Sequence, residues 1–357
     1  KACQMNKKFY ITIIPGDGIG KEVMPEALKI LEIIGKKYNF TFVFDVKDWS
    51  CERYHQKGTM MPADGLEQMQ NADAILLGAC GFPGVPDHIS LWGLLIPIRR
   101  KFRQYVNLRP IRLFEGIQSP LRGRECGDIN FWIVRENNEG EYSEIGGRLY
   151  ENTENELVVQ QSVFTRLGTD RIMRAAFDLA KTREKRHVTS ATKSNGIIHS
   201  MPYWDERFLE ISKTYPEVST AQFHIDILAA QFVLNPDWFD VVVASNLFGD
   251  ILSDLGPAIT GTIGIAPSGN INPERDYPSC FEPVHGSAPD IAGKGIANPI
   301  GQIWSAAMML EHLKEKKAAD NILMAIERVL RDGTCKTRDI GGNAMTSEIG
   351  RAIADNL

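Results

Sequence analysis

The sequence predicts an α/β fold built around a large, mostly parallel sheet, and three observations support this prediction. Short runs rich in β-branched residues alternate with segments whose apolar residues recur at helical spacing, as in successive βα units. Glycine-rich loops follow two of these runs, at residues 16–20 and 78–84. The run at residues 241–244 is continuously apolar rather than alternating, which is typical of a strand buried on both faces.

The first βα unit is a strand at residues 9–14, a loop at residues 15–20 and a helix at residues 22–34. The loop has the glycine spacing G-x-G-x-G, not the G-x-G-x-x-G of a dinucleotide-binding Rossmann unit. A tight turn and a bound cofactor would explain these glycines equally well. Strands are also expected at residues 41–46 and 74–78, with a helix between them that has Asp64 as its N-cap.

Three arginines, Arg99, Arg109 and Arg135, are candidates for binding carboxylates. A guanidinium group meets the two oxygens of a carboxylate with two N–H groups. A single arginine is usually a solvated surface charge, and we expect this of Arg100. Arg135 is the strongest candidate, because it ends the apolar strand at residues 131–134.

The middle of the chain continues with a polar turn or arm around residues 146–156 and a candidate strand at residues 158–164. An amphipathic helix at residues 169–181 precedes a strand that ends at Lys193. An isolated lysine is normally solvated, and Asp226 would be an ordinary polar residue. Spacing alone therefore gives neither residue a role.

The most informative stretch is Asn246-Leu-Phe-Gly-Asp-Ile-Leu-Ser-Asp254, directly after the buried run. If a helix begins near Phe248, Asp250 and Asp254 lie four residues apart on one face. Like charges at that spacing destabilise a helix by roughly 0.2–0.5 kcal/mol, and a bound Mg²⁺ or Mn²⁺ would offset this. The alternative is two solvated carboxylates in the first turn, which the helix dipole favours.

The C-terminal part contains two loops, at residues 281–291 and 293–299, that spacing alone does not connect with any chemistry. Amphipathic helices are expected at residues 302–313, 318–331 and 346–357, and we expect them to pack on the core.

Composition excludes several classes of protein. A net charge of −5 is not the basic field of a nucleic-acid-binding protein. No apolar run approaches the length of a membrane span, and no stretch near the start resembles a signal peptide. The six cysteines form no Cys-x-x-Cys pair and suit a reducing cytoplasm. Met5 is expected to be the native start, with residues 1–4 as a remnant of cloning.

The stretch at residues 246–254 resembles the metal-binding motif of the β-decarboxylating dehydrogenases, the family of isocitrate, 3-isopropylmalate, tartrate and D-malate dehydrogenases. Further matches extend from residue 13 to about residue 300. The resemblance implies an isopropylmalate-dehydrogenase-like two-domain fold with a large mixed, mostly parallel sheet, not a standard Rossmann fold. Residues 1–104 and 262–357 would form the cofactor-binding domain. Residues 105–261 would carry the dimer contact and much of the substrate and metal site.

The resemblance also implies roles for individual residues. The catalytic residues would be Lys193 and Tyr142, and the substrate would be bound by Arg99, Arg109, Arg135 and Trp92. The metal ligands would be Asp226, Asp250 and Asp254, with Lys193 and Asp226 reaching in from the other subunit of a homodimer. The cofactor contacts would be Ile19, His285, Gly286, Ser287, Ala288, Asp290, Ile291 and Asn298. The implied cofactors are NAD and Mg²⁺ or Mn²⁺, and a requirement for K⁺ stays open.

The implied function is NAD- and metal-dependent oxidation, with or without decarboxylation, of a small 2-hydroxy dicarboxylate. Residues 87–93 and 270–281 match the tartrate/D-malate branch more closely than the 3-isopropylmalate branch, and Trp92 would fill the space of the isopropyl group. Oxidation of 3-isopropylmalate is the alternative. A non-catalytic dicarboxylate-binding protein is a second alternative, but it would not need Lys193, Tyr142 and the acid pair together.

Overall fold

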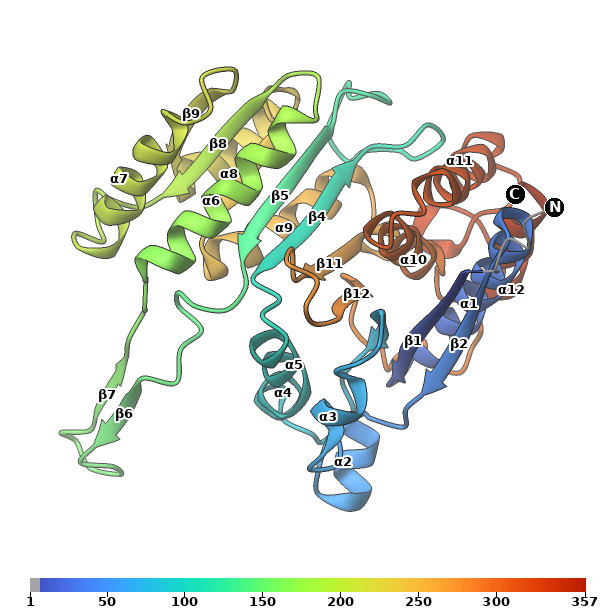
Figure 1. The fold of residues 1–357 in the computed structure, drawn as a ribbon, viewed down its shortest axis with the longest axis horizontal. Coiled ribbons are helices and arrows are strands. Elements are labelled where there is room, and N and C mark those ends of the chain that lie inside the picture. Colours follow the sequence, from blue (N-terminus) through green and yellow to red (C-terminus); the bar gives the residue numbers. More distant parts are fainter. Residues whose placement is uncertain (1–6) are drawn as a thin grey trace.

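The computed structural model describes residues 7–357, so the expectation about residues 1–4 lies outside the described part of the chain. Ten strands form one mixed sheet in the order β2-β1-β3-β12-β11-β4-β5-β10-β8-β9. Helices lie on both faces of this sheet (Figure 1). The sheet is parallel except for three antiparallel pairs in its middle, which separate two parallel groups. The predicted α/β fold with a mostly parallel sheet is therefore confirmed.

The first parallel group consists of β1 (Lys7–Gly16), β2 (Phe40–Val46), β3 (Ala74–Ala79) and β12 (Ser279–Pro283). Alternate side chains of these strands enter two different cores, as the period of two requires. One core packs against α1 (Gly20–Tyr38), α10 (Ile300–His312), α11 (Lys316–Asp332) and α12 (Thr346–Asp355). The other packs against residues of α2 (Cys51–Lys57), α3 (Gly65–Met69) and α5 (Ile96–Lys101).

The second group consists of β5 (Asn130–Glu136), β10 (Val241–Ala244), β8 (His187–Thr192) and β9 (Ser219–His224). Between the groups lie β11 (Pro267–Ile271) and β4 (Val106–Arg112), each antiparallel to both neighbours. A separate core joins this half to α6 (Arg166–Lys181), α7 (Ser200–Ser212), α8 (Ile225–Leu234) and α9 (Asn246–Thr260). The division into two domains stays a prediction, because one sheet passes through both halves.

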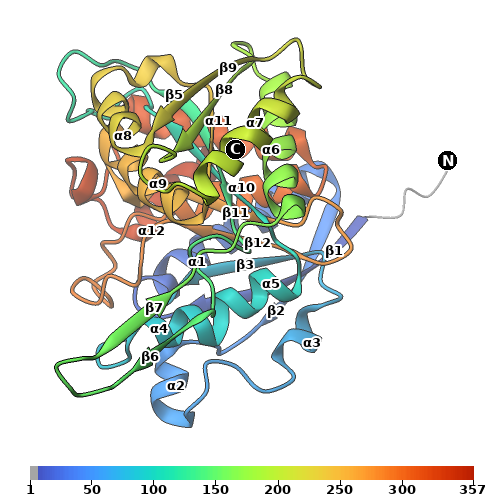
Figure 2. The same ribbon diagram turned by 90° about the vertical axis from the view of Figure 1, so that its left-hand side faces the viewer.

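A two-stranded arm projects from the second half of the molecule. It consists of β6 (Gly146–Leu149) and β7 (Leu157–Gln160), which pair antiparallel to each other. The arm stands clear of the body in Figure 1 and points toward the viewer in Figure 2. Its strand residues are all exposed, including the apolar Leu149, Leu157, Val158 and Val159.

Several local predictions need correction. Asp64 stands at the N-cap of α3, but its carboxylate accepts a hydrogen bond from Gln68 and caps no backbone N–H. The strand predicted at residues 158–164 is only the short β7. α9 begins at Asn246, two residues before the predicted start. The segment from α4 (Asp87–Ser90) to α5 is helical throughout, and its middle is the π-helical turn η1 (Leu91–Leu95).

Three short 3₁₀ helices complete the fold: η2 (Pro236–Trp238), η3 (Ile263–Ile265) and η4 (Arg338–Ile340). Between residues 7 and 357, no helix combines the length and the apolar character that crossing a membrane requires.

Candidate active site

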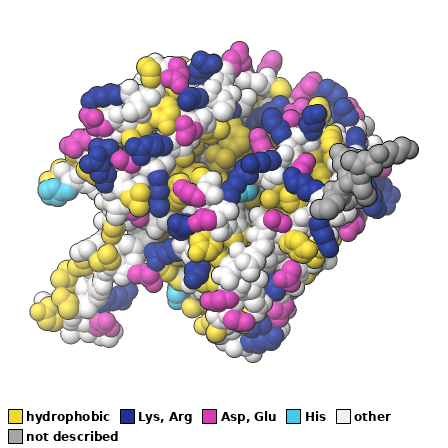
Figure 3. All heavy atoms as spheres, viewed as in Figure 1, with side chains coloured by type: hydrophobic (Ala, Val, Ile, Leu, Met, Phe, Trp, Pro, Cys, Tyr) yellow, Lys and Arg dark blue, Asp and Glu magenta, His cyan; other side chains and the backbone are white. Residues whose placement is uncertain are grey.

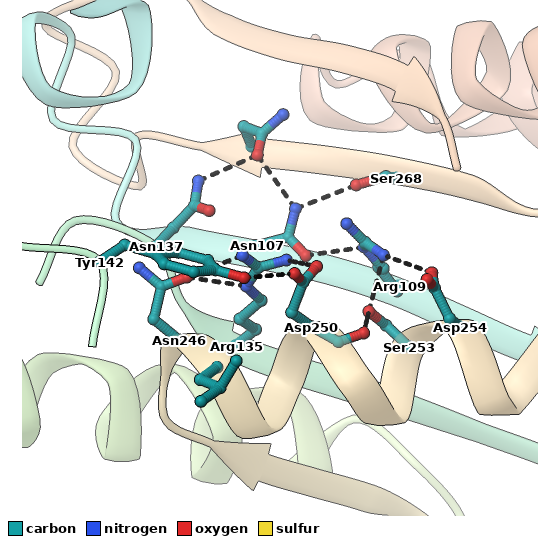
Figure 4. A network of polar contacts seen from close by, with 12 residues as sticks. Asn107, Arg109, Arg135, Asn137, Tyr142, Asn246, Asp250, Ser253, Asp254 and Ser268 are labelled. Atoms are coloured by element: carbon teal, nitrogen blue, oxygen red, sulfur yellow. Dashed lines mark hydrogen bonds and ion pairs between the residues drawn. The ribbon is translucent and has the colours of Figure 1, made fainter. Parts of the chain in front are cut away.

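Helix α9 carries two carboxylates that face buried arginines from β4 and β5 (Figure 4). Asp250 accepts hydrogen bonds from Arg135 Nη1 at 2.5 Å and from the Tyr142 hydroxyl at 2.6 Å. Asp254 Oδ1 lies 3.7 Å from Arg109 Nη1. The structure therefore brings together five of the predicted site residues: both metal-ligand candidates of α9, two arginines and the tyrosine.

Arg135 is held over α9 by a close fit of strand and helix. Its Nε and Nη2 both donate to Asn246 Oδ1, at 3.0 and 2.8 Å. Its aliphatic stem crosses the helix at Gly249, where an added Cβ would lie 2.6 Å from Arg135 Cβ and Cγ. The glycine of the motif is thus needed for this close approach.

Arg109 and Arg99 have separate anchors. Arg109 donates through Nε to Asn107 Oδ1 at 3.0 Å and through Nη1 to Ser253 Oγ at 2.6 Å. Arg99 donates through Nη2 to Glu282 Oε1 at 3.3 Å. Each of the three arginines is at most 8% exposed. A buried guanidinium costs free energy unless it is paired, so this cluster is more than a set of surface charges.

Burial and charge perturb the titrating groups of the site. Burial lowers the pKa of Arg135 to about 10, which still leaves it charged at neutral pH. Burial, together with the hydrogen bond to Asp250, raises the pKa of Tyr142 to about 12. Burial alone would raise the pKa of Asp250, but Arg135 and the Tyr142 hydroxyl outweigh it and lower this pKa. The pKa of Asp254 is raised by burial, so the two carboxylates titrate differently.

Lys193 and Asp226 form a pair of their own. Lys193 Nζ donates to Asp226 Oδ1 at 2.7 Å, and the Asp226 side chain is 61% exposed. Within the described chain, neither residue forms a hydrogen bond or an ion pair with Asp250 or Asp254. Among residues 7–357, no three His, Cys, Asp or Glu side chains lie close enough together to hold a metal ion. One chain thus brings the predicted catalytic lysine and third metal ligand to each other but not to α9.

The predicted cofactor residues lie on two loops that touch. Ile19 N donates to Ser287 O at 2.9 Å, and a Cβ on Gly18 would lie 2.0 Å from that same oxygen. The Ile19 side chain is buried in a small cluster that includes Ala288, Ile291 and Ala292. Asp290 and Gly286 are exposed.

His285 and Asn298 are buried beside these loops. Asn298 Nδ2 donates to Asp339 Oδ2 at 3.0 Å. His285 Nδ1 lies 2.9 Å from Gly286 O, while its Nε2 is buried without a partner. Burial lowers the pKa of His285, so its ring is neutral at pH 7. An unpaired buried nitrogen is suited to a hydrogen bond with a ligand.

A cavity of about 480 Å³ opens between the glycine loop, residues 81–83 and residues 289–293. It lies outside the carboxyl ends of β1 and β3, where the strand order reverses, the usual ligand position in an open α/β sheet. A larger cavity of about 650 Å³ lies between α1 and α2 and contains none of the predicted site residues.

Trp92 lies in the π-helical turn and is half-buried rather than part of a core. The guanidinium of Arg100 lies 5.0 Å from the centre of its ring. Arg100 also donates to Tyr142 O at 3.2 Å and to Glu144 at 2.6 Å, so the expectation that it is simply solvated was wrong. Trp92 and Arg100 are eight residues apart, and the stretch between them includes part of a π turn, which the sequence does not indicate.

Comparisons with known proteins agree with this geometry. A model of the isocitrate/isopropylmalate dehydrogenase family matches residues 10–353. The chain is 59% identical to a tartrate dehydrogenase/decarboxylase of Pseudomonas putida and 58% identical to a D-malate dehydrogenase [decarboxylating] of Escherichia coli, with 98% of each chain covered in both cases. A crystal structure of isocitrate dehydrogenase from Methylococcus capsulatus superimposes with a TM-score of 0.88 at 34% identity, covering 98% of this chain and 99% of that one.

Proposed function

This chain belongs to the isocitrate/isopropylmalate dehydrogenase family, and we propose that it oxidises D-malate or a tartrate with NAD and a divalent metal ion, with or without decarboxylation. The observation that carries the proposal is the contact of Asp250 with Arg135 and Tyr142 on the face of α9. It places a carboxylate, a carboxylate-binding group and a proton donor within one hydrogen-bond network. The family and the names of this chain's relatives place its activity among the oxidoreductases.

The arginines would bind and orient the substrate. Guanidinium groups of Arg99, Arg109 and Arg135 would hold its carboxylates and fix the C2–H bond relative to the nicotinamide. Their burial excludes water, which strengthens each charge–charge interaction. Trp92 would narrow the space at C3, which favours hydrogen or hydroxyl there over an isopropyl group.

Two residues would move protons. Lys193 Nζ, after releasing its ammonium proton to solvent, would accept the proton of the C2 hydroxyl. NAD, when bound, would supply the hydride acceptor. Tyr142 would donate its hydroxyl proton to the carbon that has lost carbon dioxide. Its pKa of about 12 keeps that hydroxyl protonated at neutral pH until the carbanion-like centre develops.

The residues present fit the implied metal ion and cofactor. Asp250, Asp254 and Asp226 offer only carboxylate oxygens, the donors that Mg²⁺ and Mn²⁺ prefer. Such an ion would supply Lewis-acid stabilisation of negative charge on the substrate oxygens. The unpaired His285 Nε2 and the exposed Asp290 suit the adenosine part of NAD. A K⁺ requirement and a cytoplasmic location stay predictions.

We further propose a homodimer with shared active sites. Lys193 and Asp226 would complete the site of the other subunit, because within one chain they do not reach α9. Apolar side chains are exposed on α8 and α9, among them Leu234 at 62% and Ile251 at 51%. The arm adds more exposed apolar surface, which is visible in Figure 3 at the tip of the projection. Exposed apolar surface of this kind is typical of a protein–protein interface.

The test assays a panel of 2-hydroxy acids with Mn²⁺ and NAD and measures the formation of NADH by its absorbance at 340 nm. We expect D-malate or a tartrate to exceed 3-isopropylmalate at least tenfold in kcat/KM, the order of discrimination a small apolar group supplies. A preference for 3-isopropylmalate would overturn the substrate assignment. Metal-dependent dicarboxylate binding with no turnover of any substrate would instead favour the non-catalytic binding protein.

A further inference from the structure

A chain of buried polar groups joins Arg99 to Arg109. Glu282 Oε1 accepts from Arg99 Nη2 at 3.3 Å and from Asn270 Nδ2 at 2.8 Å. Asn270 Oδ1 accepts from Asn107 Nδ2 at 3.0 Å, and Asn107 Oδ1 accepts from Arg109 Nε at 3.0 Å. The two guanidinium groups are therefore connected through three side chains, with Asn270 at the centre.

The sheet places these side chains side by side. The antiparallel register pairs Asn270 of β11 with Asn107 of β4, and Ser268 of β11 with Glu282 of β12. Residues directly opposite or two apart on neighbouring strands share a face and lie within contact of each other. Asn270 is 1% exposed and Asn107 is fully buried, so water does not compete for these hydrogen bonds.

The surroundings fix which way the Asn270 amide points. Its oxygen accepts from the amide nitrogens of Asn107 and Asn137, at 3.0 and 2.9 Å, while its nitrogen faces the carboxylate of Glu282. A reversed amide would set its NH₂ group against two donors and its oxygen against a carboxylate. Asn270 thus holds a donor toward the Arg99 side and an acceptor toward the Arg109 side. An ionised aspartate lacks the donor, and a shorter residue lacks both groups.

We propose that Asn270 is a positioning residue that fixes Arg99 relative to Arg109 and thereby sets the length of dicarboxylate that the site binds. The inference rests on the proposed function, in which these guanidinium groups hold the substrate's carboxylates. Arg109 has a second anchor in Ser253, at 2.6 Å. Within residues 7–357, the Arg99 side chain hydrogen-bonds Glu282 alone, so the placement of Arg99 depends on how firmly Asn270 holds that carboxylate.

Removing this bridge should reduce both the selectivity and the affinity of dicarboxylate binding. A dicarboxylate presents two charges at a separation set by its carbon chain. Guanidinium groups held at a fixed separation favour one chain length, because the wrong length leaves one charge without its pair. When the bridge is removed, Arg99 can move with Glu282 and accommodate other lengths. Binding of the best ligand weakens at the same time, because the arginine must be ordered during binding.

The experiment compares wild type with Asn270→Ala. Binding of malonate, succinate and glutarate, with three, four and five carbons, is measured calorimetrically in the presence of Mn²⁺. We expect wild type to bind succinate about tenfold more tightly than the other two, a difference that one poorly paired charge supplies. In Asn270→Ala, succinate should bind about tenfold more weakly and the preference should fall below about threefold. In turnover, KM for D-malate or tartrate should rise while kcat and KM for NAD stay within about threefold.

Asn272→Ala is the matched control. Asn272 is equally buried, two residues further along, and its amide donates to Phe102 O and to Asp276, the ion-pair partner of Arg103, rather than toward Arg99 or Arg109. Losing this amide should change stability but leave the preference for succinate intact. Asn270→Leu is the second variant, for use if Asn270→Ala does not fold. Leucine is close to asparagine in size but has neither the acceptor for Asn107 nor the donor to Glu282, so the preference should again fall.

The possible failures can be told apart. A wild-type preference for succinate that persists in folded Asn270 variants overturns the positioning role and leaves the proposed function standing. Equal binding of all three acids by wild type also overturns it. Absence of both dicarboxylate binding and turnover in wild type would remove the proposed function, and the positioning role with it.

Discussion

Gly249→Ala tests whether the close fit between α9 and Arg135 is required for activity. An alanine Cβ at this position would lie 2.6 Å from Arg135 Cβ and Cγ and 3.1 Å from Cδ. Carbon atoms in contact need about 3.5–4.0 Å, so the stem of Arg135 must move by roughly 1 Å. Its guanidinium would then leave the oxygens of Asn246 and Asp250.

The expected losses of activity and stability differ. A misplacement of about 1 Å in a group that positions the substrate costs on the order of 100-fold in rate. Alanine in a helix gains up to about 1 kcal/mol over glycine, whereas overpacking costs about 1–3 kcal/mol. Even without the helical gain, the free energy of unfolding should thus fall by no more than about 3 kcal/mol, and the variant should fold.

The assay is kcat/KM for the best substrate of the panel, with the unfolding midpoint measured on the same preparation. Gly350→Ala is the control, since its added Cβ in α12 would meet only the flexible end of the Glu26 side chain. We expect that variant to keep wild-type activity. If Gly249→Ala is folded and its kcat/KM stays within about threefold of wild type, the argument from Arg135 is wrong.

Three other predictions follow from the structure and the proposed function. Mixing inactive Lys193→Ala chains with inactive Asp250→Asn chains should restore activity, because one site of the mixed dimer is intact. If the subunits exchange and no activity returns, the shared site is refuted. NAD should exceed NADP in kcat/KM, because the exposed carboxylate of Asp290 accepts hydrogen bonds from ribose hydroxyls and repels a 2′-phosphate; equal values would contradict this. Burial raises the pKa of Glu136 from 4.5 to about 7, so its protonation stabilises the fold fully below pH 4.5, and this contribution is lost as pH rises through 7. Between pH 5 and pH 8, denaturant unfolding should therefore show wild type losing more stability than Glu136→Gln, by on the order of 2–3 kcal/mol, and parallel pH profiles would refute the shift.

The sequence predicted those parts of the fold that depend on local pattern. Apolar runs became β1, β3 and β10, and the four-residue spacing placed Asp250 and Asp254 on one face of α9. The helix begins at Asn246, two residues before the predicted start at Phe248. The Asn246 side chain bonds Arg135 while its backbone already belongs to the helix.

The supports of the arginines could not be predicted in this way. Asn107, Asn270 and Glu282 meet only because two antiparallel pairs place β11 between β4 and β12. No spacing along the chain encodes that register. One signal was available: Asn107 precedes Arg109 by two residues on a strand, so both side chains point to the same face. The π turn around Trp92 also depends on tertiary packing rather than on local sequence.

Charge balance explains why the site contains so many paired ions. Arg99, Arg109 and Arg135 carry three positive charges, and Asp250, Asp254 and Glu282 carry three negative charges, so this group is neutral. The proposed contribution of the partner subunit, Lys193 with Asp226, adds no net charge.

A dicarboxylate and a divalent cation are likewise neutral together, whereas either one alone leaves two unbalanced charges in a partly buried space. Because isolated charges are costly there, each of the two ligands should bind more tightly in the presence of the other, and the coupling must be reciprocal. The same reasoning explains why the arginines are buried with partners already in place: the site holds its charges in position before the substrate arrives, and less ordering remains to be done on binding.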